Sequence, residues 1–75
     1  MPYLTKDKQG LIQLWVNKPE FNEVMDCYFA WIDKGVINEV PIDVTSNDYI
    51  RGLFATYDVP CCIDITSLNY KIIKV

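Results

Sequence analysis

The C-terminal stretch DVPCCIDITSLNYKIIKV, positions 58–75, constrains the fold more than any other part of the sequence. It holds two runs rich in β-branched and aromatic residues, 61–66 and 69–75, with a short polar turn around Ser67 and Leu68 between them. Pro60 stands just before the first run, where its missing N–H removes no hydrogen bond from a sheet. This pattern predicts a β-hairpin with a rigid lead-in.

A second hairpin is predicted at the N-terminus. The runs 3–7 and 11–16 are rich in apolar residues, and Gly10 between them can adopt the positive φ that a short hairpin loop needs. In the second strand Ile12 and Leu14 share one face, and Trp15 lies on the other. Because that other face is not polar enough to be fully solvated, we expect both sides of this strand to be at least partly covered.

The segment 18–34 predicts a helix. Asn17 can cap its start, Pro19 fits the first turn, and Gly35 can end it. The apolar residues recur at helical spacing, at Phe21, Val24, Met25, Tyr28, Phe29 and Ile32. The aromatic run 27–32 would serve equally well as a strand, so that alternative stays open.

Residues 36–57, between the predicted first helix and the C-terminal hairpin, have clearer patterns. Residues 36–44 read as extended, and Pro41 makes this stretch an edge or irregular strand. The cluster 45–48 is rich in capping residues and opens a short helix at 48–57. The predicted fold is therefore α+β. It is a small single domain, 1–75, with an N-terminal β-hairpin, one or two helices (about 18–34 and 48–57) and a C-terminal β-hairpin.

Length and composition limit the class of protein. A 75-residue chain has a small core, but its 51% hydrophobic residues argue against disorder. No apolar run approaches the roughly 20 residues that span a membrane. The first ten residues contain no apolar core of a signal peptide. We therefore expect a cytoplasmic protein with no membrane partner.

The cysteine and histidine content limits the catalytic and metal-binding chemistry that this chain can perform. The chain has Cys27, Cys61 and Cys62 but no histidine, which removes His-based nucleophile schemes and His-based zinc sites. As strand neighbours, Cys61 and Cys62 would point to opposite faces, one into the core and one outward. A redox pair usually has C-x-x-C spacing at a helix N-terminus, and a metal needs more ligands than one sulfur on each face. We therefore predict structural thiols, no catalytic residues, no cofactor, no metal and no enzyme activity.

Charge is distributed unevenly along the chain. The net charge is −3, but positions 20–64 carry nine acidic residues against only Lys34 and Arg51. This segment argues against nucleic-acid binding and suits a partner protein with a basic surface. It could also do no more than keep an apolar domain soluble. The candidate partner-binding surface comprises Glu20, Glu23, Asp26, Asp33, Glu39, Asp43 and Asp48.

The N-terminal pattern Y-L-x-x-D-K-x-G at 3–10, followed by Leu14-Trp15 and Lys18-Pro19, resembles the opening of small phage- and prophage-borne proteins of unknown function. Trp31 and the D-x-P lead-in at 58–60 are similar in order and rough spacing. The resemblance implies that Trp31 lies on a strand of a mainly antiparallel domain. It also implies a viral or mobile-element origin, and no catalytic residue can be carried over.

Pro60, after a short helix, is also similar to the proline segment of thioredoxin-like proteins. Their order β-α-β-α-β-β is the alternative fold, and it requires the helix at 18–34. The chain has no cysteine at 17–20, where that family keeps its reactive thiols, and no C-terminal helix is predicted. This resemblance therefore implies no thiol chemistry.

These observations favour a non-enzymatic protein-binding module. We expect an acidic factor, encoded by a phage or mobile element, that binds and inhibits or modulates a host protein in the bacterial cytoplasm, as anti-defence proteins do. One alternative is a thioredoxin-like thiol oxidoreductase using Cys61 or Cys62. Another is a small structural subunit of a larger assembly.

Overall fold

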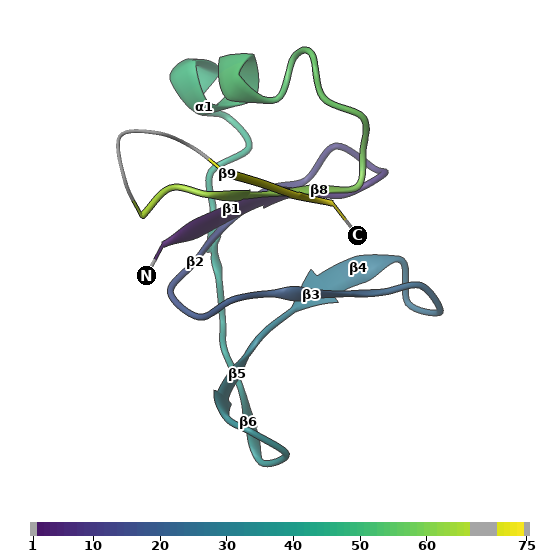
Figure 1. The fold of residues 1–75 in the computed structure, drawn as a ribbon, viewed down its shortest axis with the longest axis vertical. Coiled ribbons are helices and arrows are strands. Elements are labelled where there is room, and N and C mark those ends of the chain that lie inside the picture. The colour runs from purple at the N-terminus through teal and green to yellow at the C-terminus, as the bar shows by residue number, and fades with distance from the viewer. Residues whose placement is uncertain (1, 67–70, 75) are drawn as a thin grey trace.

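A five-stranded antiparallel sheet forms the centre of the molecule (Figure 1). The computed structural model describes residues 2–66 and the backbone of residues 71–74. The strands lie in the order β7-β2-β1-β8-β9. Their bounds are β1 (Tyr3–Lys6), β2 (Ile12–Trp15), β7 (Ile42–Asp43), β8 (Cys61–Asp64) and β9 (Lys71–Lys74).

Both predicted terminal hairpins are confirmed. Strand β1 pairs with β2, and β8 pairs with β9, each antiparallel. Gly10 closes the first hairpin with a φ of 92°. The buried Asp7 accepts hydrogen bonds at Oδ1 from the N–H groups of Gln9 and Leu11, which fixes the turn. The predicted second turn, at 67–69, lies outside the described residues.

A short helix, α1 (Asp48–Leu53), covers one face of the sheet (Figure 1). Its start agrees with the predicted cap cluster, because Asn47 accepts a hydrogen bond from the N–H of Ile50. The predicted end at 57 is wrong. The chain leaves the helix after Leu53 in a series of turns that buries Phe54 against the sheet.

The predicted helix at 18–34 is wrong. This segment forms the hairpin β3 (Glu20–Asn22) and β4 (Cys27–Phe29), followed by β5 (Trp31–Asp33). Asn22 Oδ1 accepts from the N–H groups of Val24 and Met25, and Asp26 has a φ of 56°, so the chain turns back where a helix would continue. Val24 and Met25, counted in the helical stripe, are exposed at this turn.

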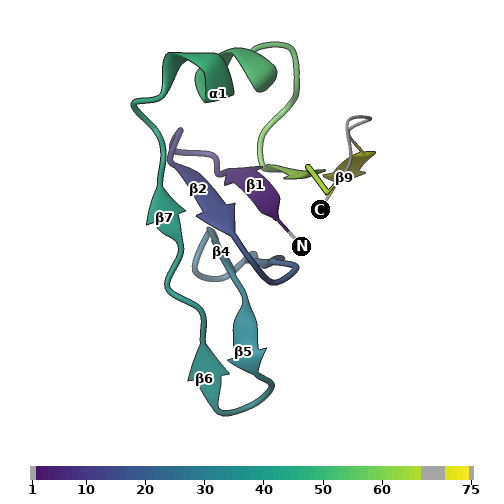
Figure 2. The same cartoon turned by 90° about the vertical axis from the view of Figure 1, so that its left-hand side faces the viewer.

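The remaining strands form an arm. Strand β5 pairs with β6 (Ile37–Asn38) through an irregular register, and Gly35 in the connecting turn has a φ of 83°. This hairpin extends away from the sheet, at the end of the molecule opposite α1 (Figure 2). After Pro41 the chain returns to the sheet as β7. The prediction of an edge strand next to this proline is confirmed.

The sheet has a buried core on each face. The helix-side core comprises Leu4, Ile12, Phe54, Cys61 and Ile63. The hairpin-side core comprises Trp15, Tyr28, Ala30 and Cys62, with Phe21 packed against it from β3. The expectation that β2 is covered on both sides is therefore confirmed.

Cys61 and Cys62 lie in different cores, as neighbouring strand residues must. The expectation that one of them points outward is wrong. Cys62 is only 2% exposed, because Tyr28 and Ala30 cover the second face of the sheet.

The described chain is a small domain made mostly of strands, with one short helix and antiparallel pairing in its central sheet. Its element order differs from β-α-β-α-β-β, because strands replace the first helix. The peptide bond between Val59 and Pro60 is cis. Trp31 lies on a strand, as the phage-protein resemblance implied.

Candidate functional site

The arm carries an unusual concentration of exposed aliphatic side chains. We define the β5–β6 arm as residues 31–40. Within it Ile32 is 62% exposed, Val36 73%, Ile37 49% and Val40 87%. Its two strands pair only with each other among the described residues, so the arm is separate from the central sheet. A patch of this kind on a small domain is typical of an interaction surface.

An apolar groove lies at the base of the arm. It has a volume of about 470 Å³ and is lined by Val16, Asn17, Ile32, Glu39 and Val40. Val16 follows β2 and is 66% exposed, so the groove joins the arm to the end of the central sheet. Its walls are aliphatic, and its polar groups come from Asn17 and Glu39.

Glu39 ties the arm to the sheet. Its carboxylate accepts hydrogen bonds from the N–H groups of Val16, at 2.6 Å, and Asn17, at 2.8 Å. The Asn17 amide Nδ2 donates a third bond, at 2.9 Å. Partial burial works against ionisation of Glu39, but these hydrogen bonds outweigh it, so the pKa of the carboxyl lies below its ordinary value. The groove therefore keeps a negative charge at its rim.

The acidic residues of the predicted partner-binding surface do not gather on one element. Glu20 lies on β3, and Glu23 and Asp26 lie in the turn that follows it. Asp33 ends β5, and Glu39 follows β6. Asp43 and Asp48 lie on β7 and α1. These elements extend from one end of the long axis of the molecule to the other, so only Asp33 and Glu39 belong to the β5–β6 arm (Figure 1).

Several of these acids have structural partners. Asp26 lies 3.6 Å from the Lys8 Nζ, and Asp48 lies 3.5 Å from Arg51. Asp43 accepts hydrogen bonds from the hydroxyl and the N–H of Thr45, which lower the pKa of its carboxyl. Glu20, Glu23 and Asp33 are exposed, and their carboxylates make no hydrogen bond or ion pair within the described part of the chain.

The sequence prediction missed the aliphatic members of this site, Val16, Ile32 and Val40. For Val40 the signal was present in the segment VINEVPIDV at 36–44, where five aliphatic residues precede or follow a proline. An aliphatic stretch interrupted by proline cannot be a central strand, so apolar side chains such as Val40, outside the paired residues, can stay exposed.

The cysteines lie away from this site. Cys27 is half-buried on β4, and none of the three cysteines, all within the described residues, forms a disulfide. Burial raises the pKa of the Cys62 thiol to about 12, so it stays protonated and poorly nucleophilic. Among the side chains that the structure describes, in residues 2–66, no group of three or more acidic or cysteine residues could hold a metal ion.

Comparison of the chain with protein-family models, with curated proteins and with solved structures finds no match. In the described part of the chain, no helix has the length and apolar character to cross a membrane.

Proposed function

We propose that this chain is a non-enzymatic protein-binding module whose working surface is the β5–β6 arm with its apolar groove. The observation that carries the proposal is the exposure of Ile32, Val36 and Val40 on an element that projects from the sheet. Aliphatic side chains exposed in this way contribute little to folding. They gain hydrophobic free energy when a partner removes them from water.

The partner we propose has a basic surface around an apolar side chain that fills the groove. Asp33 and Glu39 place carboxylates beside the aliphatic patch. The chain as a whole has a net charge of −3. Opposite charge on the partner would raise the association rate, and the groove would supply the affinity.

The biological role we propose is that of a factor encoded by a phage or mobile element that binds and inhibits or modulates a host protein. This part rests on the resemblance at 3–19 and on the size and acidity of the chain. The bacterial host cytoplasm is then the expected location.

The exposed arm would also suit a small subunit of a larger assembly, which is the second candidate. A host partner and an assembly are distinguished by the solution mass of the complex. A thiol oxidoreductase has less support, because Cys62 is buried and the pKa of its thiol is raised.

Affinity capture with three forms of the protein tests the proposal. The forms are the wild type, an arm variant carrying Ile32→Ser and Val40→Ser, and Val24→Ser as the matched control. Val24 is 93% exposed but lies in the β3–β4 turn, away from the β5–β6 arm. We expect the same partner on the wild type and on Val24→Ser, and its loss from the arm variant.

The salt dependence of capture tests the charge component. Raising the salt from about 0.05 to 0.5 M should weaken capture by the wild type, because exposed charges are screened. The absence of any retained protein, equal retention by all three forms, or capture that is insensitive to salt would contradict the proposal.

A further inference from the structure

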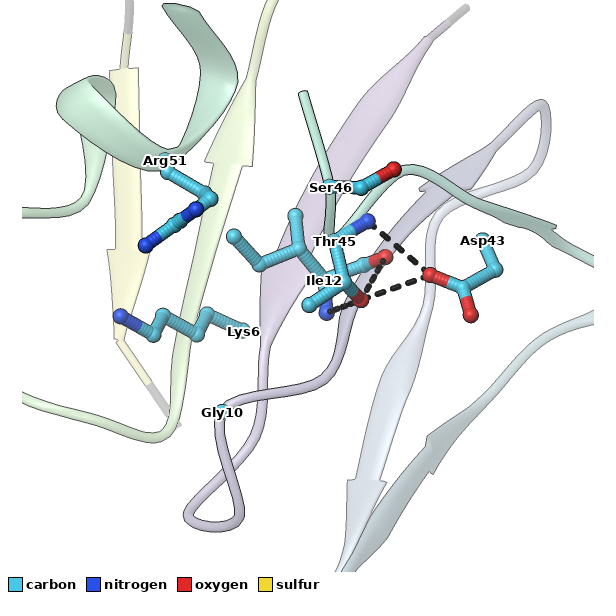
Figure 3. A pocket seen from close by; sticks show the side chains of 7 residues that line it. All are labelled: Lys6, Gly10, Ile12, Asp43, Thr45, Ser46 and Arg51. Carbon is cyan, nitrogen blue, oxygen red and sulfur yellow. Dashed lines mark hydrogen bonds between the residues drawn. The ribbon is translucent and has the colours of Figure 1, made fainter. Parts of the chain in front are cut away.

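A second concave site lies between α1 and the sheet, away from the β5–β6 arm (Figure 3). It has a volume of about 580 Å³. Its lining comes from the end of β1, the β1–β2 turn, β2, β7 and α1 with the segment before it. Elements from both halves of the chain therefore build this pocket.

Two cations line one side of the pocket. Lys6 is the half-buried last residue of β1, and Arg51 lies in the last turn of α1. Figure 3 shows both side chains extending along the same side of the pocket. Within the described residues Lys6 makes no ion pair, and Arg51 meets only Asp48, at 3.5 Å, where both groups are exposed. Such an exposed pair contributes little, so both positive charges are available to a ligand.

Asp43 also lines the pocket but does not neutralise these cations. It lies on the other side of the pocket from Lys6 and Arg51 (Figure 3). Its Oδ1 accepts from the N–H of Thr45 at 2.9 Å and from the Thr45 hydroxyl at 2.6 Å. The Thr45 hydroxyl in turn accepts from the N–H of Ile12 at 2.9 Å. Asp43 and Thr45 therefore form a structural link between β7 and β2.

The remaining lining residues add one hydrogen-bond donor and leave part of the pocket open. Ser46 is exposed, and its hydroxyl has no hydrogen-bond partner within the described chain. Gly10 has nothing within 4 Å of the position a Cβ would take, which keeps that side of the pocket open. A guanidinium, an ammonium and a hydroxyl are all donors, and the first two together suit a doubly charged oxyanion.

We infer that this pocket binds the phosphate group of a small phosphorylated molecule. The Arg51 fork can donate two parallel hydrogen bonds to phosphate oxygens, and the Lys6 ammonium adds a point charge. The volume of about 580 Å³ exceeds the space of a phosphate and leaves room for an organic part. This site is independent of the arm, so a ligand and a protein partner could be bound together.

The test is an NMR titration of the folded protein with inorganic phosphate, glycerol 3-phosphate and acetate. The variants are Lys6→Gln and Arg51→Gln, with Lys34→Gln as the matched control. Lys34→Gln also removes one positive charge, but from the β5–β6 turn. The backbone amides of Gly10, Ser46 and Arg51 report on the pocket.

We expect saturable shifts at these amides with both phosphate probes. Lys6→Gln and Arg51→Gln should each weaken binding at least about tenfold, because each removes at least one charge-assisted hydrogen bond. Lys34→Gln should leave affinity within about twofold of the wild type, since a distant exposed charge is screened. Tighter binding of glycerol 3-phosphate supports a phosphorylated small molecule, and equal binding supports free phosphate at the same site.

Three results would overturn the inference. The first is the absence of saturation with either phosphate probe. The second is a loss of affinity in Lys34→Gln as large as that in Lys6→Gln, which would show general electrostatic attraction only. The third is acetate binding as tight as phosphate, which would show a site that does not select the phosphate group.

Discussion

Trp15 donates its indole N–H to the hydroxyl of Thr5 at 2.9 Å, between neighbouring strands of the central sheet. Both residues are buried, with Thr5 0% and Trp15 2% exposed. The hydroxyl is therefore the acceptor that lets an indole lie in the hairpin-side core without an unsatisfied donor.

Thr5→Val should lower the free energy of unfolding by about 1–3 kcal/mol, because it leaves the buried indole N–H without an acceptor. The same substitution made together with Trp15→Phe should cost much less, since the donor is then gone. Chemical denaturation of the two single variants and the double variant gives the coupling energy. A coupling near zero would contradict this role of the hydrogen bond.

Tyr28 presents the opposite case. Its hydroxyl is buried with no hydrogen-bond partner among the described residues, and burial raises its pKa above the ordinary value. Tyr28→Phe should therefore raise the free energy of unfolding, by about 1 kcal/mol, because a buried unsatisfied hydroxyl is unfavourable. Tyr49→Phe is the control, as Tyr49 is 72% exposed and should show almost no change. Destabilisation by Tyr28→Phe would show that the hydroxyl has a partner.

The link between Glu39 and the segment after β2 should depend on pH. The pKa of Glu39 in the folded chain lies below its ordinary value of 4.5. Its carboxylate therefore adds stability that is complete above about pH 4.5 and is lost as the pH falls through the lowered pKa. We expect Glu39→Gln to destabilise the fold by no more than about 1 kcal/mol near neutral pH, because the bonds are exposed.

Denaturation of the wild type and Glu39→Gln between neutral and acidic pH checks this dependence. The difference between the two should shrink as Glu39 becomes protonated. Asp33→Asn removes a carboxylate on the same arm that makes no hydrogen bond within the described residues, and it serves as the control. A difference that stays constant across this pH range would contradict the role of Glu39.

The thiols should differ in reactivity. Cys27 is half-buried, whereas Cys61 and Cys62 are 1% and 2% exposed. With iodoacetamide at about pH 8 we expect Cys27 to react first and the adjacent pair only after unfolding. Mass spectrometry of peptides identifies the modified residue, with Cys27→Ala as the control. Rapid labelling of Cys61 or Cys62 in the folded protein would support the thiol oxidoreductase alternative.

The parts of the fold that the sequence predicted correctly are specified locally. Gly10 provides a positive φ between two apolar runs, and Asn47 provides a side-chain cap where α1 starts. Pro41 marks the edge strand for a similar reason, because it lacks a backbone donor. In each case one residue type allows few conformations, and no distant contact is needed to choose among them.

The segment 18–34 could not be assigned in this way. Its apolar residues satisfy a helical spacing, and its aromatic run satisfies a strand equally well. The structure shows what decides between them. Tyr28 and Ala30 cover Trp15 and Cys62 on the second face of the sheet, and that contact joins residues far apart in the sequence. A tertiary contact of this kind is absent from any local pattern.

In the candidate site, too, some features follow from the local sequence and others depend on tertiary structure. The excess of acids was visible in the sequence, but where they lie depends on the fold, which places them on several different elements. The exposure of Ile32 and Val40 depends on the arm extending away from the sheet, and their hydrophobicity alone suggested burial. The site is therefore apolar with an acidic rim, where the sequence predicted an acidic surface.

The most direct test of the central claim measures two quantities on the arm variant carrying Ile32→Ser and Val40→Ser. These are its free energy of unfolding and its affinity for the partner captured by the wild type. We predict a stability within about 0.5 kcal/mol of the wild type, because exposed side chains contribute little to folding. We also predict an affinity at least about tenfold weaker, because burial of these two side chains is lost. An arm variant that binds the partner as tightly as the wild type would contradict the account.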